Sequence, residues 1–261
     1  MVRTLLIRGM LVGILAGLIV FAFGKFVGEP PVNRAIGFES AQQETRAKTE
    51  NTHGVHAMEE PELVSRGVQS GIGLFTGVMV YATAFGGLFA LVFAVADRRI
   101  GNLGPRAVSA LLATVGFIAV YGIPYLKYPA NPPSVGHAET IGQRTALYFI
   151  MLAFSVTAMV VAAVMRKRLV ARFGGWNAAL LACGFYLLAV LAAASILPAV
   201  NEVPEAFPAV VLWQFRLASL GMQFIMWATL GLVFGSLTER ALAKSAHAFQ
   251  PALRRPAARA H

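Results

Sequence analysis

The sequence predicts an all-α membrane protein: a bundle of about six transmembrane helices with both termini in the cytoplasm. Two observations place it in this class. First, 57% of its 261 residues are hydrophobic and only 13% are charged, whereas a soluble domain carries about 25% charged residues. Second, it contains apolar runs of about 20 residues, the length that crosses a hydrocarbon core about 30 Å thick. Such runs should be helical, because backbone groups in lipid must bond to each other. The six runs are residues 9–28, 68–96, 107–126, 146–165, 177–200 and 217–237.

The first run follows Arg3 and Arg8, as the core of a secretory signal peptide would. No small-x-small cleavage pattern precedes the return of polar sequence, and the run is long for a signal core. We therefore expect an uncleaved first helix. Residues 1–240 are expected to form a single transmembrane helical domain.

Glycines spaced four apart lie on one face of several predicted helices. This spacing allows close helix packing and suggests an oligomer formed through Gly-x-x-x-Gly faces. The alternative is that glycine is simply common in membrane helices. The glycines concerned are Gly9, Gly13 and Gly17, and the pairs Gly67/Gly71, Gly73/Gly77 and Gly231/Gly235.

Orientation follows from the distribution of charge. Fourteen of the 22 Lys and Arg residues fall on the side that holds both termini, and ten of the twelve Asp and Glu residues fall on the other side. The positive-inside rule therefore places both termini in the cytoplasm. The Ala-, Pro- and Arg-rich segment 241–261 lacks an apolar face, which predicts a disordered basic cytoplasmic tail.

The segment 29–67 is expected to be an extracytoplasmic loop rich in His and Glu. Imidazoles and carboxylates bind borderline divalent metals such as cobalt, nickel and zinc. Four residues of this loop are therefore candidate metal ligands: His53, His56, Glu59 and Glu60. The alternative is a solvated loop, since Gly54 argues against a rigid helix that would fix both histidines on one face.

Two further outer loops are stiffened by proline. "KYPANPP" and "LPAVNEVPEAFP" should be extended or turned, because residues before proline avoid helical geometry. These loops either form an outer vestibule for a cation or act as rigid connectors between helix ends. The candidate vestibule residues are Asn131, His137, Glu139, Asn201, Glu202 and Glu205.

Several classes of function are excluded or disfavoured. The basic residues flank membrane helices, so anionic lipid explains them better than nucleic acid does. No Gly-rich phosphate loop is present, which argues against ATP hydrolysis. All five histidines lie in predicted loops or the tail, which disfavours haem at membrane depth. The lone Cys183 cannot form an internal disulfide. We expect neither an enzyme nor a permanently bound cofactor.

Several stretches carry a family resemblance: "YLKYPANPPSVGHAETIGQRTALYF", "LPAVNEVPEAFPAVVLWQFRLASLG", "LVFGSLTER", and the first helix with its His- and Glu-bearing loop and "VSRGVQSGIG". Together they resemble the CbtA family of predicted cobalt transporter subunits over about residues 1–240. The resemblance implies a multi-pass protein of the bacterial inner membrane that takes up cobalt, with Co²⁺ as substrate, for cobalamin supply. It also implies a small single-helix partner, the B subunit, with a His-rich end.

The chain departs from the family pattern in three ways. His137-Ala138 stands where the resemblance leads us to expect an acidic residue followed by proline, and the first outer loop holds only two histidines. The family is commonly drawn with about five spans, whereas six are predicted here.

A metal-capture scaffold that serves another permease stays open as an alternative to a transporter.

Overall fold

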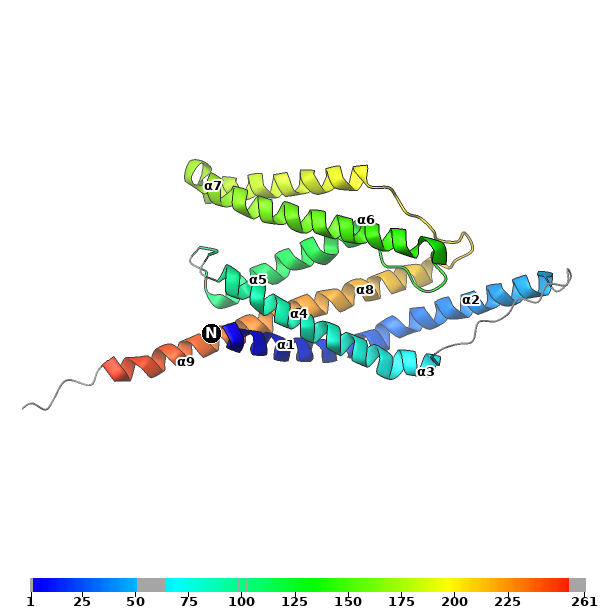
Figure 1. Cartoon of the computed structure of the whole chain (residues 1–261), viewed down its shortest axis with the longest axis horizontal. Coiled ribbons are helices and arrows are strands. Elements are labelled where there is room, and N and C mark those ends of the chain that lie inside the picture. Colours follow the sequence, from blue (N-terminus) through cyan, green and yellow to red (C-terminus); the bar gives the residue numbers. More distant parts are fainter. Residues whose placement is uncertain (1, 51–63, 98, 102, 254–261) are drawn as a thin grey trace, which may run out of the picture. The chain divides into compact units, whose positions relative to one another are not determined.

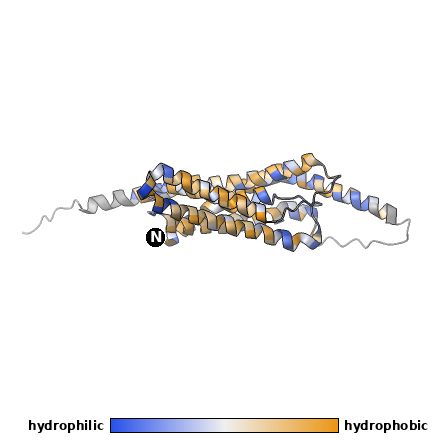
Figure 2. Ribbon diagram, turned by 90° about the horizontal axis from the view of Figure 1, so that it is seen from above, coloured by the Kyte–Doolittle hydropathy of each residue, from blue (hydrophilic) through white to orange (hydrophobic). Residues whose placement is uncertain are grey.

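The computed structural model describes residues 2–50, 64–97, 99–101 and 103–253 (Figure 1). Within these residues, all regular secondary structure is helical. Five helical stretches are long and apolar enough to cross a membrane: Val2–Thr45, Arg66–Ala96, Pro105–Lys127, Ala138–Ile196 and Ala209–Lys244. Hydrophobic residues cover most of the length of these helices (Figure 2). The prediction of an all-α protein is confirmed for the described residues, whose helices are long and apolar enough for a membrane protein. The number of six spans stays a prediction.

The contacts of the chain group into two compact units. The single transmembrane domain over residues 1–240 stays a prediction. Unit 1 contains residues 1–22, 66–115 and 224–261, and unit 2 contains residues 23–65 and 116–223. Unit 1 therefore holds most of α1 (Val2–Phe23), α4 (Leu74–Ala96), most of α5 (Pro105–Gly116) and α9 (Gly235–Leu253). Unit 2 holds α2 (Glu29–Glu50), α6 (Ile123–Lys127), α7 (Ile141–Ile196) and most of α8 (Ala209–Thr229).

In unit 1, glycines let α1 lie directly against α4. A Cβ atom on Gly9 would collide with the carbonyl oxygen of Gly86, and one on Gly13 would collide with that of Ala82. Small residues permit this backbone approach, which gains van der Waals contact in the absence of a hydrophobic driving force. This glycine face of α1 is therefore used within the chain and is not open to a second copy.

The same unit uses a second glycine pair to bring α5 close to the π-helical turn η6 (Leu230–Phe234) and to α9. Ser109 Oγ donates a hydrogen bond to the Gly231 carbonyl at 2.8 Å, and a Cβ on Gly235 would lie 2.8 Å from Ser109 Cβ. Edge-to-face aromatic contacts of Phe89 and Phe93 with Phe234 add to this packing.

In unit 2, α7 consists of two arms that fold back on each other (Figure 1). The helical geometry breaks at Gly174, where φ is 73° and ψ is 167°, a region that is essentially restricted to glycine. Met151 and Ala158 of the first arm share a buried cluster with Tyr186 of the second. The hydroxyls of Ser155 and Tyr186 are hydrogen-bonded at 2.9 Å. The separate helices expected at 146–165 and 177–200 correspond to these two arms.

Residues 29–50, expected as the start of a long loop, are instead the helix α2. Pro30 and Pro31 directly follow the π-helical turn η1 (Gly24–Gly28), through which α2 continues from α1 without a break. Proline and π-helical turns are usual places for a long helix to bend. The rest of α2 is rich in Ala, Gln, Glu and Arg, which favour helix. One face of α2 carries Ala35 and Phe38, which pack against Phe207. The polarity of α2 therefore reflects a solvated helix with one buried stripe.

The C-terminal segment also differs from expectation. α9 continues as helix to Leu253, whereas residues 241–261 were expected to be disordered. Ala, Leu and Lys between residues 241 and 246 are good helix formers, and a helix already under way extends at little cost. Residues 254–261 lie outside the described part of the chain.

Candidate functional site

The site is built from two proline-containing loops of unit 2, residues 128–137 and residues 197–208. The first follows α6, which begins after the π-helical turn η4 (Phe117–Gly122) and carries Pro124 near its start. It ends in a tight turn in which Ser134 has a φ of 68° and Gly136 a φ of 110°. Ser134 Oγ donates to the Ala35 carbonyl at 3.0 Å, which ties this turn to α2.

Glu202 joins the two loops. Its Oε2 atom accepts hydrogen bonds from the backbone N–H of His137 at 2.9 Å and from the Thr140 hydroxyl at 2.8 Å. Arg144 Nε lies 3.5 Å from the same oxygen, and Arg144 Nη2 donates to the His137 carbonyl at 3.2 Å. Only 14% of the Glu202 side chain is exposed. One carboxylate oxygen thus accepts two hydrogen bonds, from His137 and Thr140, and forms an ion pair with Arg144 at the start of α7.

These contacts favour the ionised form of Glu202. The hydrogen bond from the His137 backbone is the largest cause that lowers the pKa of this carboxyl, and the Thr140 hydroxyl and the Arg144 guanidinium lower the pKa further, while partial burial opposes them. Glu202 is therefore a charged residue with its donors already in place. A metal ion could use Oε2 only by displacing some of them.

Arg216, on α8, makes a second set of contacts to the first loop. Its Nη2 atom donates to Asn131 Oδ1 at 2.9 Å and its Nε atom to the Ala130 carbonyl at 3.3 Å. Tyr125 Oη donates in turn to the Arg216 carbonyl at 2.7 Å, and Tyr128 Oη donates to the Pro198 carbonyl at 2.8 Å. Both loops are therefore fixed by side chains from the neighbouring helix ends.

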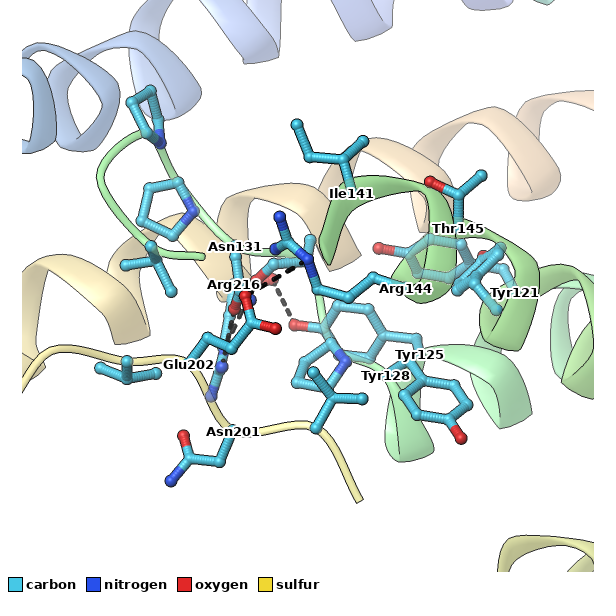
Figure 3. Close-up of a pocket in the computed structure, with 18 residues that line it drawn as sticks. Tyr121, Tyr125, Tyr128, Asn131, Ile141, Arg144, Thr145, Asn201, Glu202 and Arg216 are labelled. Carbon is cyan, nitrogen blue, oxygen red and sulfur yellow. Dashed lines mark hydrogen bonds and ion pairs between the residues drawn. The ribbon is translucent and has the colours of Figure 1, made fainter. Parts of the chain in front are cut away.

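Together these residues line an open pocket of about 710 Å³. Figure 3 shows Arg144, Arg216, Asn131 and Glu202 close together in it, with the tyrosines beside them. The polar and aromatic side chains of the lining include Tyr121, Tyr125, Tyr128, Tyr148, Asn131, Asn201, Arg144, Arg216 and Glu202.

Comparison with protein families decides the assignment. The family model described as probable cobalt transporter subunit (CbtA) matches residues 2–239. The chain belongs to the CbtA family. This confirms the resemblance seen in its proline loops and first helix. Comparisons with curated proteins and with solved structures gave no match.

The structure of this CbtA family member brings together some of the predicted vestibule residues. Asn131, Asn201 and Glu202 line the pocket, and His137 reaches it through its backbone N–H. Glu139 and Glu205 are exposed and do not line the pocket. In residues 2–50, 64–97, 99–101 and 103–253, no three His, Cys, Asp or Glu side chains are arranged to hold a metal. The candidate ligands His53, His56, Glu59 and Glu60 lie outside the described residues.

Reasoning from the sequence missed the two arginines and the tyrosines of the pocket. A signal for the arginines was available, since Arg144 and Arg216 are basic residues in segments that the charge pattern predicts to lie outside, where acidic residues predominate. Both also lie just before predicted spans, 146–165 and 217–237, and close to the proline loops in the sequence. The tyrosines gave a weaker signal, because aromatic residues are common near membrane interfaces for other reasons.

Proposed function

We propose that this protein is a membrane subunit of a cobalt uptake system and helps to pass Co²⁺ across the bacterial inner membrane, for cobalamin supply. The family match over residues 2–239 is the observation that carries this proposal. The five long apolar helical stretches support it, because a transporter subunit must cross the bilayer. We propose no enzymatic activity and no resident cofactor, with cobalt as the substrate.

We propose six spans, with both termini cytoplasmic. The break at Gly174 supports the count, because the two arms of α7, residues 141–173 and 175–196, are each long enough to cross a hydrocarbon core of about 30 Å at about 1.5 Å per residue. The turn between the arms follows Arg166, Lys167, Arg168 and Arg172. Such a basic segment favours the cytoplasmic side.

The energy source proposed for uptake is the membrane potential or a partner protein. Among the described residues, the buried polar or charged side chains are Ser109, Ser155 and Thr238. Hydroxyls of this kind do not relay protons at neutral pH in the manner of the Asp, Glu or His chains of proton-coupled carriers. A doubly charged ion gains about 4.6 kcal/mol per 100 mV on moving inward, twice the value for a single charge.

The partner proposed is a small single-helix protein, the B subunit, with a His-rich end. The part of the chain that the structure describes offers no ready-made metal cluster, and Glu202 is already engaged by donors. Imidazoles from a second chain would supply ligands suited to cobalt.

The same observations support a second candidate, a scaffold that captures metal and serves another permease. Radioactive cobalt uptake into proteoliposomes separates the two. We expect uptake by vesicles that contain this chain and its partner, increasing with an inside-negative potential set by a potassium gradient and valinomycin. Empty vesicles serve as the control. Uptake no faster than in empty vesicles, at any potential and with the partner present, would contradict the transporter proposal.

A further inference from the structure

The pocket of unit 2 is large for a metal ion. A divalent ion with six waters, at about 30 Å³ each, occupies about 180 Å³, whereas the pocket measures about 710 Å³. Pockets of about 300–1,000 Å³ are typical of small organic ligands. The pocket therefore has room for an occupant with a carbon skeleton.

The charge of the pocket lining favours an anion. Two guanidinium groups, Arg144 and Arg216, face one carboxylate, Glu202. Glu202 is paired with Arg144, so the lining carries one uncompensated positive charge. That charge belongs to Arg216, whose side chain donates to two neutral oxygens, those of Ala130 and Asn131. Within the described residues, no carboxylate pairs with Arg216.

The chemistry of the walls narrows the class of anion. A guanidinium binds carboxylate oxygens in a planar, often bidentate arrangement. The tyrosine rings supply an amphipathic wall, and the Tyr125 and Tyr128 hydroxyls are already directed at backbone carbonyls. A small molecule with several carboxylates fits both features: one carboxylate meets Arg216, and the carbon skeleton lies against the rings.

We propose that this pocket binds a small polycarboxylate anion and that cobalt reaches the protein there as the chelate of that anion. This inference rests on the proposed function. Several carboxylates on one skeleton can bind a divalent metal and a guanidinium at the same time. A bare cation, in contrast, is repelled by the uncompensated charge of Arg216. The pocket docks the chelate. For the metal to move inward, imidazoles of the proposed partner would replace the carboxylate oxygens on cobalt, and the free anion would return to the outside.

Binding is tested by calorimetric titration of the purified full chain in detergent. Three ligands are compared in a non-coordinating buffer: citrate, the 1:1 cobalt(II)–citrate complex and cobalt chloride. The cobalt(II)–citrate complex carries a net charge of −1. We expect both citrate-containing ligands to bind, and the Arg216→Gln variant to weaken their binding at least tenfold. Arg216→Lys keeps the positive charge but lacks the planar guanidinium, so its affinity for citrate should lie between those of the parent and Arg216→Gln. The control is Arg168→Gln, an exposed arginine of α7 in the same unit, which should bind as the parent does. Circular dichroism and thermal unfolding establish that each variant is folded.

Three results would overturn the inference. The first is equal citrate affinity in the parent and in a folded Arg216→Gln variant. The second is displacement of bound citrate by cobalt chloride at concentrations too low to chelate it. The third is loss of citrate binding when phosphatidylglycerol is added to the micelles, since the pocket would then be a lipid headgroup site. Uptake from cobalt chloride in proteoliposomes tests the proposed function separately, so either proposal can fail while the other stands.

Discussion

The Glu202 carboxylate accepts a hydrogen bond from the backbone N–H of His137 at 2.9 Å, across 65 residues of sequence. The bond connects the two proline loops, which are also joined by the hydrogen bond from Tyr128 to the Pro198 carbonyl and by the packing of Val135 with Phe207. The same carboxylate oxygen also meets the Thr140 hydroxyl and the Arg144 guanidinium. Glu202 therefore serves first as a link between the loops, and the shape of the pocket depends on it.

Replacing Glu202 with Gln should loosen this link. The amide keeps the size of the side chain but loses its charge, and hydrogen bonds to a charged acceptor are roughly twice as strong as neutral ones. We expect a lower midpoint of thermal unfolding in detergent. The matched control is Glu205→Gln in the same loop, an exposed residue, which should unfold at the parental temperature. Equal midpoints for both variants and the parent would mean that Glu202 does not hold the loops together.

The contribution of Glu202 should depend on pH in one direction. Folding lowers the pKa of this carboxyl, mainly through the His137 backbone hydrogen bond. A group with a lowered folded pKa contributes stability above its unfolded pKa, about 4.3 for glutamate, and this contribution is lost as pH falls through the folded value. The difference in unfolding midpoint between parent and Glu202→Gln should thus be full at pH 6–7 and shrink below about pH 4. A difference that grows on acidification would contradict this assignment.

The break in α7 should depend on glycine at one position only. Gly174 has a φ of 73° and a ψ of 167°, and a non-glycine residue in this region costs about 1–3 kcal/mol. Gly174→Ala should lower the free energy of unfolding by about that amount. The adjacent Gly175→Ala is the matched control, because a Cβ there meets open space and its φ is not positive. Equal stability of the two variants in reversible unfolding would show that the arms can turn without a glycine.

How far the sequence predicts this fold depends on the segment. The apolar helices could be predicted from the length and composition of the runs, because the backbone of such a run in lipid must form its hydrogen bonds internally. α2 was missed because its buried stripe is narrow, with Ala35 and Phe38 on an otherwise polar helix, and its partner Phe207 is far away in sequence. The grouping into two units is likewise not visible in the sequence, since it depends on contacts between distant segments.

The site could be predicted only in part. Prolines and oxygen-bearing side chains marked the loops that build it, and Asn131 and Glu202 do line the pocket. What each side chain does there depends on its partners. The sequence suggests a free carboxylate at Glu202, but in the structure it accepts two hydrogen bonds and forms an ion pair with Arg144. The sequence pattern gives the residue types of a site and not their pairing.

Packing of α1 on α4 gives a further prediction. Gly9→Ala would place a Cβ against the Gly86 carbonyl and the Ala90 side chain, and overpacking of this kind typically costs about 1–3 kcal/mol. Gly77→Ala on α4 is the control, because nothing lies within 4 Å of its Cβ, and alanine is the better helix former. We expect the first variant to unfold more easily and the second to be neutral or more stable. A Gly9→Ala variant as stable as the parent in the same detergent would contradict the close contact between α1 and α4.

The segment 51–63 carries the candidate metal ligands His53 and His56 and can be tested in cells. If both imidazoles bind cobalt, the double change to Ala should reduce cobalt-dependent growth at limiting cobalt, and excess cobalt should restore it, since a weaker site fills at higher concentration. The control is His261→Ala at the C-terminus. Growth of the double variant that matches the parent over the whole cobalt range would remove the pair from the list of ligands.

The proposed sidedness gives the last prediction. Charge places the proline loops outside and the turn of α7 in the cytoplasm, so single cysteines in the two places should differ in accessibility. In a Cys183→Ala parent, Glu139→Cys should react with a membrane-impermeant maleimide in intact cells. Arg168→Cys should react only after the cells are permeabilised. Both positions are exposed, so burial does not account for a difference. If Arg168→Cys is labelled in intact cells and Glu139→Cys is not, the topology is the reverse of the one proposed. The pocket would then face the cytoplasm and could not receive cobalt from outside.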